Sequence, residues 1–173
     1  MNINLSYLII LIILIIISEK CYKFVENYTN RKSVCNNLDG RCYSISTKYK
    51  PSSYYDASAT LAHLNKYAIK LLRHLRKKFL FENNGTSYCK DAVKYLLHNY
   101  DPHKIIENVP TSIYNTSYVE DKGKVFAVCL RERNTGHNNI HKNHILEFVL
   151  IHEMAHLSCF NIGHGNEFWE KFK

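Results

Sequence analysis

The residues best suited to chemistry in this chain lie near its C-terminal end, in the pattern His-Glu-x-x-His. His152 and His156 stand four positions apart, so on a helix their imidazoles project from one face and can bind a single metal ion. Glu153 follows the first histidine, and its carboxylate can reach a metal-activated water without being a metal ligand. This arrangement is typical of the general base of a zinc-dependent peptidase. Because the motif is short, its surroundings decide how much it means.

The stretch that leads into this motif predicts a central, buried helix. Residues 145–151 are almost entirely apolar, and Asn143 suits the N-cap position. A buried unpaired charge costs several kcal/mol unless it is neutralised or coordinated. Two histidines and a glutamate in such a helix therefore favour a metal site over core residues that are satisfied by hydrogen bonds.

A catalytic zinc usually takes three protein ligands plus water, so a third ligand is needed from outside the helix. His164 is the preferred candidate, because it directly follows Gly163, where the chain can reverse. Glu167 and Glu170 are the alternatives, since either carboxylate can serve as a downstream ligand. Three other histidines precede the helix and are expected in a surface loop: His137, His141 and His144.

The remaining sequence predicts a small α+β domain around this helix. Strands are expected over residues 42–47, 114–120 and 124–130, the last two joined by a turn at 121–123. Helical periodicity predicts helices over 56–81 and 87–98. Cys35 and Cys42 can close a short loop, whereas the six cysteines contain no CxxC pair that would indicate a cysteine-ligated metal.

Composition and charge exclude little beyond disorder. Apolar residues make up 46% of the chain and charged residues 22%, as in ordinary globular proteins. The formal net charge of +8 is compatible with nucleic acid or an anionic membrane as a partner. The densest basic run, residues 70–78, lies in a predicted amphipathic helix, so we interpret it as a solvated face, with nucleic-acid binding as the alternative.

The N-terminal segment predicts membrane association. Leu8 to Ile17 is an unbroken run of Leu and Ile, and residues 1–17 carry no charge. As a helix they would reach about 25 Å, marginally enough for a thin bilayer. Because basic residues before the run and a small-residue cleavage site are both missing, residues 1–18 predict a single-pass anchor, with a signal peptide and secretion as the alternative. Residues 19–36 are expected to be a linker, and residues 37–173 the metallopeptidase domain.

Two elements in order resemble zinc peptidases of the WLM and SprT-like group. Residues 148–156 (FVLIHEMAH) and 162–169 (IGHGNEFW) match its HExxH helix and its following Gly-His element with Glu-Phe. Residues 39–41 (DGR), 116–118 (TSY) and 129–131 (CLR) are similar to the membrane-anchored version of large DNA viruses. The resemblance implies a zincin-type α+β fold, with a short antiparallel sheet on the HExxH helix, and makes His164 the third zinc ligand.

We therefore expect a zinc metalloendopeptidase that acts on a protein or peptide substrate. His152, His156 and His164 would bind Zn²⁺, and Glu153 would be the general base. An extended substrate can pair with the 125–130 strand or its hairpin partner, and the candidates for stabilising the oxyanion are Tyr118 and Arg131. Two alternatives stay open: a catalytically inactive, zinc-stabilised binding domain, and a DNA-associated protease of the SprT-like type.

Overall fold

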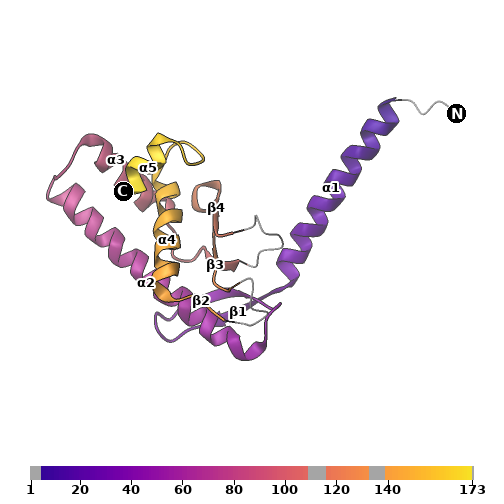
Figure 1. Ribbon diagram of the computed structural model, residues 1–173, viewed down its shortest axis with the longest axis horizontal. Coiled ribbons are helices and arrows are strands. Elements are labelled where there is room, and N and C mark those ends of the chain that lie inside the picture. The colour runs from indigo at the N-terminus through magenta and orange to yellow at the C-terminus, as the bar shows by residue number, and fades with distance from the viewer. Residues whose placement is uncertain (1–4, 109–115, 133–138, 173) are drawn as a thin grey trace. The chain divides into compact units, whose positions relative to one another are not determined.

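The computed structural model describes residues 5–108, 116–132 and 139–172 (Figure 1). The chain forms two compact units, Met1–Arg31 and Lys32–Lys173. The first unit contains helix α1 (Leu5–Thr29), on which the Leu and Ile side chains of the apolar run are exposed. Among the described residues, no helix is both long and apolar enough to cross a membrane. The anchor at residues 1–18 stays a prediction.

The stretch predicted as a polar linker, residues 19–36, is largely regular structure. Helix α1 continues to Thr29, and strand β1 (Arg31–Cys35) follows. A disulfide joins Cys35 at the end of β1 to Cys42 at the start of β2 (Cys42–Ser46), which confirms the predicted short loop. The turn between these two strands contains Gly40 with a φ of 72°, a backbone conformation that favours glycine.

A five-stranded mixed sheet forms the framework of the second unit, in the order β1-β2-β3-β5-β4. Strand β3 (Ile105–Asn108) runs parallel to both β2 and β5 (Val125–Cys129). Strand β4 (Tyr118–Glu120) pairs with β5 in the antiparallel direction, as the hairpin prediction required. The expectation of an antiparallel sheet is wrong for the centre, because the long connection between β2 and β3 holds two helices and allows parallel pairing.

Strand β3 was not predicted, and Glu107 is the physical reason. This carboxylate is fully buried, and its Oε1 accepts a 2.7 Å hydrogen bond from Arg131 Nε, while Oε2 accepts one of 2.9 Å from Ser46 N. A charged side chain can lie inside a sheet when it is paired. The partner of Glu107 is Arg131, 24 residues further along the chain, so the local sequence gives no sign of a strand at this position. Arg131 also donates to Ser53 Oγ and lines neither hollow beside the histidines, so it has a structural place rather than the predicted role at the oxyanion.

The helices confirm the sequence pattern with small shifts at their ends. Helix α2 (Tyr54–Arg76) follows a 3-10 turn η1 (Pro51–Ser53) and ends in a π turn η2 (Lys77–Phe81). Helix α3 (Ser87–Asn99) is capped by Thr86, whose Oγ1 accepts from Cys89 N. Helix α4 (Asn143–Ser158) begins at the residue predicted as its cap, and Lys142 holds the cap position. Helix α5 (Asn166–Phe172) ends the described chain.

The core lies between the sheet and helices α2, α3 and α4. Figure 1 shows α4 running between α2 and the strands, and α4 packs on both. The sequence predicted that α4 is buried on all sides, and this is wrong. Two of its apolar side chains are exposed, Ile145 by 42% and Phe148 by 60%. Side chains of this core come from all three helices and the sheet, among them Tyr43, Ile45, Leu61, Leu64, Leu96, Phe126, Leu146, Leu150, Met154 and Leu157.

The turn between β4 and β5 fixes the C-terminal end of α4. This turn, η3 (Asp121–Gly123), places Gly123 at a φ of 101° against the last turn of α3. A Cβ on Gly123 would lie 2.1 Å from Asn99 O, while Asn99 Nδ2 donates a 2.8 Å hydrogen bond to Leu157 O. The hairpin, the end of α3 and the end of α4 are thus held together at one point.

Replacing Gly123 with Ala is therefore expected to lower the free energy of unfolding by at least about 2 kcal/mol, because backbone has to move as well as adopt a strained φ. The matched control is Gly40→Ala, which has a φ of 72° and open space around a new Cβ. It should cost only about 1 kcal/mol, the strain of the left-handed conformation alone. Urea unfolding followed by circular dichroism measures both, and equal losses would contradict the close packing of this turn.

Candidate metal centre

Three histidine side chains converge at the C-terminal end of α4. His152 and His156 lie one helical turn apart on the same face, and His164 comes from the loop between α4 and α5. His164 Nε2 lies 2.9 Å from His152 Nε2 and 3.2 Å from His156 Nε2. The ligand atoms of the three residues all lie within 4.8 Å of one another. The structure therefore brings together the three residues that were predicted to bind zinc.

The donor set fits a zinc ion. Nitrogens about 2.0–2.1 Å from one tetrahedral zinc would lie roughly 3.3–3.4 Å apart, close to the observed spacing of His164 from His156. Three imidazoles with solvent access are also the ligand set of catalytic rather than structural zinc. Within the described residues, the cluster contains no carboxylate or thiol that would close a fourth position.

The surroundings of His152 and His156 favour the neutral form of imidazole, which is the form that binds a metal. Burial lowers the pKa of His152, and the nearby His164 lowers it further. Burial lowers the pKa of His156 to about 4, with further contributions from His164, His152 and the ammonium group of Lys122. Neutral imidazoles present lone pairs, so these two residues do not have to lose protons to bind a cation at neutral pH.

Phe168 of α5 supports all three imidazoles. Its side chain is 1% exposed, and its ring centroid lies 4.9 Å from His152, 4.4 Å from His156 and 4.6 Å from His164. Phe172 stacks on Phe168, with ring centroids 5.5 Å apart, and also lies against His152. Helix α5 thus provides the apolar layer that fixes the orientation of the histidine rings.

The loop that carries His164 is held by Glu167 and two lysines. The Glu167 carboxylate accepts hydrogen bonds from Phe160 N, Asn161 N and Lys171 Nζ, at 2.7, 3.0 and 2.7 Å. Lys122 Nζ donates to Cys159 O at 2.8 Å, so the β4–β5 turn also holds the start of this loop. Lys122 was not predicted from sequence, because only folding brings the turn to the end of α4.

The two carboxylates that were the alternative third ligands make their contacts away from the histidine cluster. Glu167 faces the loop backbone and Lys171. Glu170 faces Tyr88, and its carboxylate adds to burial in raising the pKa of the Tyr88 hydroxyl. Neither carboxylate belongs to the histidine cluster. Helix α4 ends at Ser158, five residues before Gly163, so Gly163 does not end the helix. It lies in the loop that follows, with a φ of 91° and open space around it.

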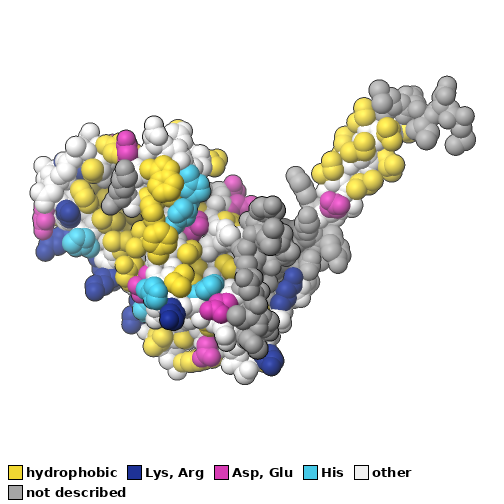
Figure 2. Space-filling model, viewed as in Figure 1, with side chains coloured by type: hydrophobic (Ala, Val, Ile, Leu, Met, Phe, Trp, Pro, Cys, Tyr) yellow, Lys and Arg dark blue, Asp and Glu magenta, His cyan; other side chains and the backbone are white. Residues whose placement is uncertain are grey.

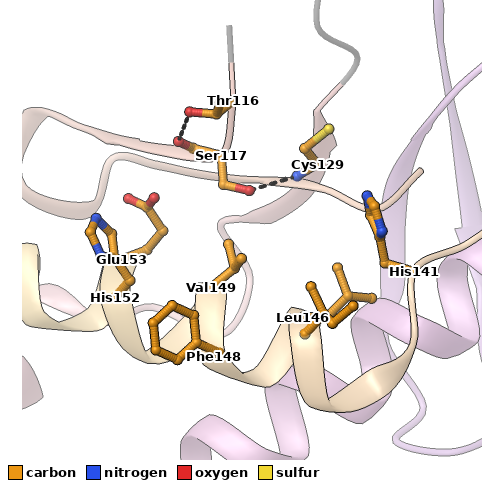
Figure 3. A pocket seen from close by; sticks show the side chains of 10 residues that line it. Thr116, Ser117, Cys129, His141, Leu146, Phe148, Val149, His152 and Glu153 are labelled. Atoms are coloured by element: carbon orange, nitrogen blue, oxygen red, sulfur yellow. Dashed lines mark hydrogen bonds between the residues drawn. The ribbon is translucent and has the colours of Figure 1, made fainter. Parts of the chain in front are cut away.

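Glu153 lies beside the cluster in a partly apolar setting. Glu153 is 6% exposed, and burial raises the pKa of its carboxyl group to about 7. It lines two neighbouring hollows together with His152, of about 340 and 500 Å³. In Figure 3 the Glu153 carboxylate points into the smaller hollow, toward Ser117 and Thr116.

The smaller hollow is lined by both α4 and the β4–β5 hairpin. Ile145, Leu146, Phe148 and Val149 come from α4, while Thr116, Ser117 and Cys129 face them from the hairpin side (Figure 3). Ser117 Oγ accepts a hydrogen bond from Cys129 N, which fixes that wall. The exposed apolar face of α4 therefore forms the floor of a recess that ends at Glu153.

The larger hollow extends past the histidines to the loop at 161–164. Tyr118 lines it, so this candidate for stabilising an oxyanion lies on the same side as the metal site. Figure 2 shows histidine side chains next to hydrophobic ones where α4 and α5 lie in Figure 1. Of the other histidines, His141 lines the smaller hollow. His144 is exposed but lies in the first turn of α4, so its prediction as a loop residue is wrong. His137 lies outside the described residues.

Comparison with known proteins gives viral relatives. An uncharacterized protein of Acanthamoeba polyphaga mimivirus is 29% identical over 175 residues, covering 98% of this chain and 79% of that protein. An uncharacterized protein of Invertebrate iridescent virus 6 is 33% identical over 57 residues, covering 33% of this chain and 32% of that protein. No family model and no solved structure matches the chain. The resemblance to WLM and SprT-like peptidases stays a prediction from the motifs.

Replacing Glu167 with Gln should weaken zinc binding about 10- to 100-fold, the usual effect of losing a residue that orients a ligand. The loop would lose its charged acceptor while keeping a side chain of the same shape. Titration calorimetry with zinc measures the change, and Glu170→Gln is the matched control with unchanged affinity. Loss of measurable binding in Glu167→Gln, as deep as in His164→Ala, would instead identify Glu167 as a ligand.

The same carboxylate predicts a pH dependence of stability. Burial alone would raise the pKa of Glu167, but hydrogen bonds from Lys171, Phe160 and Asn161 outweigh it and lower the pKa to about 2. A lowered pKa gives stability that is fully present above the ordinary value of 4.5 and is lost as the pH falls toward about 2. In zinc-free protein, the stability difference between wild type and Glu167→Gln should shrink over this range in acid unfolding. A constant difference would contradict the assigned contacts.

Proposed function

We propose that this protein is a zinc-dependent endopeptidase of the zincin type. The observation that carries the proposal is the convergence of His152, His156 and His164 beside the buried carboxyl group of Glu153. When bound, zinc would polarise a peptide carbonyl and lower the pKa of a water molecule toward neutrality. The recess on each side of the cluster leaves room for a polypeptide at this point.

Glu153 would move the proton during hydrolysis. Its carboxylate accepts a proton from the attacking water and donates it to the nitrogen of the leaving amine. Burial gives this group a pKa of about 7, near the value at which one group can both accept and donate a proton at neutral pH. His152 and His156 stay neutral and orient toward the metal, since burial and mutual proximity lower their pKa values.

Strand β4 offers a binding edge for an extended substrate. It is the outermost strand of the sheet next to β5, and its residues Tyr118 and Val119 line the larger hollow beside the histidines. A substrate added as a further strand would bring a peptide carbonyl toward the cluster, with backbone hydrogen bonds giving affinity that does not depend on sequence. The smaller hollow would then receive a side chain next to the cleaved bond.

The other two interpretations have less support. A zinc-stabilised binding domain requires a closed first shell, whereas the described cluster has three ligands and lies next to open hollows. A DNA-associated protease would need a continuous basic face along residues 70–78. Part of that run is engaged locally, since Arg76 lies over Phe81 and Lys77 pairs with Glu82.

Replacing Glu153 with Gln should reduce peptide hydrolysis by roughly 10²- to 10⁴-fold, because the proton acceptor is lost. Zinc content should stay at one ion per chain, since Glu153 is not among the ligands. Both are measured on the same purified protein, with a fluorogenic casein substrate and atomic absorption. Unchanged cleavage would remove Glu153 from the mechanism, and wild type without stoichiometric zinc would remove the metal site itself.

The smaller hollow predicts a preference for apolar side chains next to the cleaved bond. Val149→Phe should narrow it and reduce cleavage beside large apolar residues by about tenfold or more relative to small ones. Cleavage of a peptide library, with the cut sites identified by mass spectrometry, measures the preference. Ile162→Val is the control, because Ile162 lines only the larger hollow of the two. An unchanged preference in Val149→Phe would exclude this hollow as the specificity pocket.

A further inference from the structure

A separate hollow of about 740 Å³ lies between α2 and the turn before β2. It shares no lining residue with the two hollows beside the histidines. Lys66, Lys70 and Arg73 line it from α2, and Asp39 and Arg41 line it from the turn. Figure 2 shows Lys and Arg side chains gathered along the course of α2 in Figure 1. The metallopeptidase proposal makes no use of this hollow.

The three cations of α2 lie on one face of the helix, and no described acidic side chain pairs with them. Their positions are four and three residues apart, so they span about 10 Å along the helix axis. All three are exposed, and their side chains form no hydrogen bond or ion pair with described residues. Like charges at these spacings repel one another, so an anion in the hollow would stabilise this stretch of α2.

Arg41 adds a fourth positive charge from the opposite wall. Its NH1 lies 3.3 Å from Asp39 Oδ2, and its Nε is buried without a hydrogen-bond partner in the described part of the chain. Asp39 is also engaged by the hydroxyl of Tyr43 and the backbone N–H of Arg41. The single carboxylate of the hollow is therefore already satisfied, and it neutralises one of four cations.

The remaining walls are apolar or locally paired. Leu38, Tyr67 and Ile69 line the hollow, and they offer a surface for the uncharged part of a ligand. His63 also lines the hollow, and its Nε2 lies 2.8 Å from Glu147 Oε1. A cationic array with an apolar wall, in a volume within the usual range for small-molecule sites, favours a compact polyanion.

We propose that this hollow binds a small ligand that carries two or more linked phosphate groups. Several cations along about 10 Å match charges spread over a phosphate chain better than one isolated anion. Arginine pairs with phosphate oxygens through parallel hydrogen bonds, and lysine supplies point charges around them. This site is separate from the metal centre, so a test of phosphate binding does not depend on the proposed peptidase activity.

Inorganic tripolyphosphate is the probe, with the full-length protein and titration calorimetry at low ionic strength. The test variant is Lys66→Gln with Lys70→Gln, and the matched control is Lys77→Gln with Lys78→Gln, which removes the same charge from the end of the same helical segment outside the hollow. Tripolyphosphate affinity should fall at least about tenfold in the test variant and stay within about twofold in the control. Circular dichroism verifies that both variants are folded.

The other arms decide which source of phosphate the hollow takes and whether the proposal stands. A nucleoside triphosphate that binds more tightly than tripolyphosphate, with the gain lost in Tyr67→Ala, would identify a nucleotide, and equal binding would identify inorganic polyphosphate. Equal losses in the test and control variants would overturn the proposal, because charge alone would then explain binding. Binding of a single-stranded oligonucleotide but not of tripolyphosphate would also overturn it and indicate a nucleic-acid surface instead.

Discussion

The close approach of three imidazoles over the ring of Phe168 is the constraint on which the rest of this domain depends. The Nε2 atom of His164 lies 2.9 Å from that of His152 and 3.2 Å from that of His156, so the surrounding elements have to hold three imidazoles in close contact. Helix α4 holds two of them by its regular geometry. The third is held by a loop whose first residues are hydrogen-bonded both by Glu167, at Phe160 N and Asn161 N, and by Lys122, at Cys159 O. Helix α5 is therefore short but essential to the geometry, since it supplies both Phe168 and Glu167.

The β4–β5 hairpin joins the stability of the fold to the geometry of the site. Gly123 packs against the end of α3, and the neighbouring Lys122 reaches the carbonyl that follows α4. The same hairpin supplies the wall of the recess that faces Glu153. A change in this turn would therefore move the loop of His164 and the substrate-facing wall together. Because these contacts are close packing and hydrogen bonds from side chains to backbone carbonyls, a displacement of the turn is passed on to the end of α4.

Much of the secondary structure followed from local pattern. The helices α2 and α3, the hairpin and the Cys35–Cys42 pair agree with periodicity, turn residues and spacing, because these depend on residues close in sequence. Strand β3 did not, since a buried Glu107 breaks the apolar pattern and its partner Arg131 is supplied by a later segment. The exposure of one apolar side of α4 also could not be predicted from the sequence. An apolar sequence indicates burial in a core or in a recess equally well, and only the neighbours distinguish the two.

By itself, the sequence determined that His152 and His156 share one helical face and that Glu153 lies directly beside them, because helical spacing is a local property. It also narrowed the third ligand to His164, Glu167 or Glu170, all within reach of the chain reversal. Only the tertiary structure placed His164 at the cluster and turned Glu167 toward the loop backbone and Lys171. Which of the three residues is free to join the cluster depends on the fold, because Phe160 N and Asn161 N donate to the Glu167 carboxylate only once the loop and α5 are packed together. The basic hollow was decided in the same way, since Arg41 joins the α2 cations only when the turn packs beside that helix.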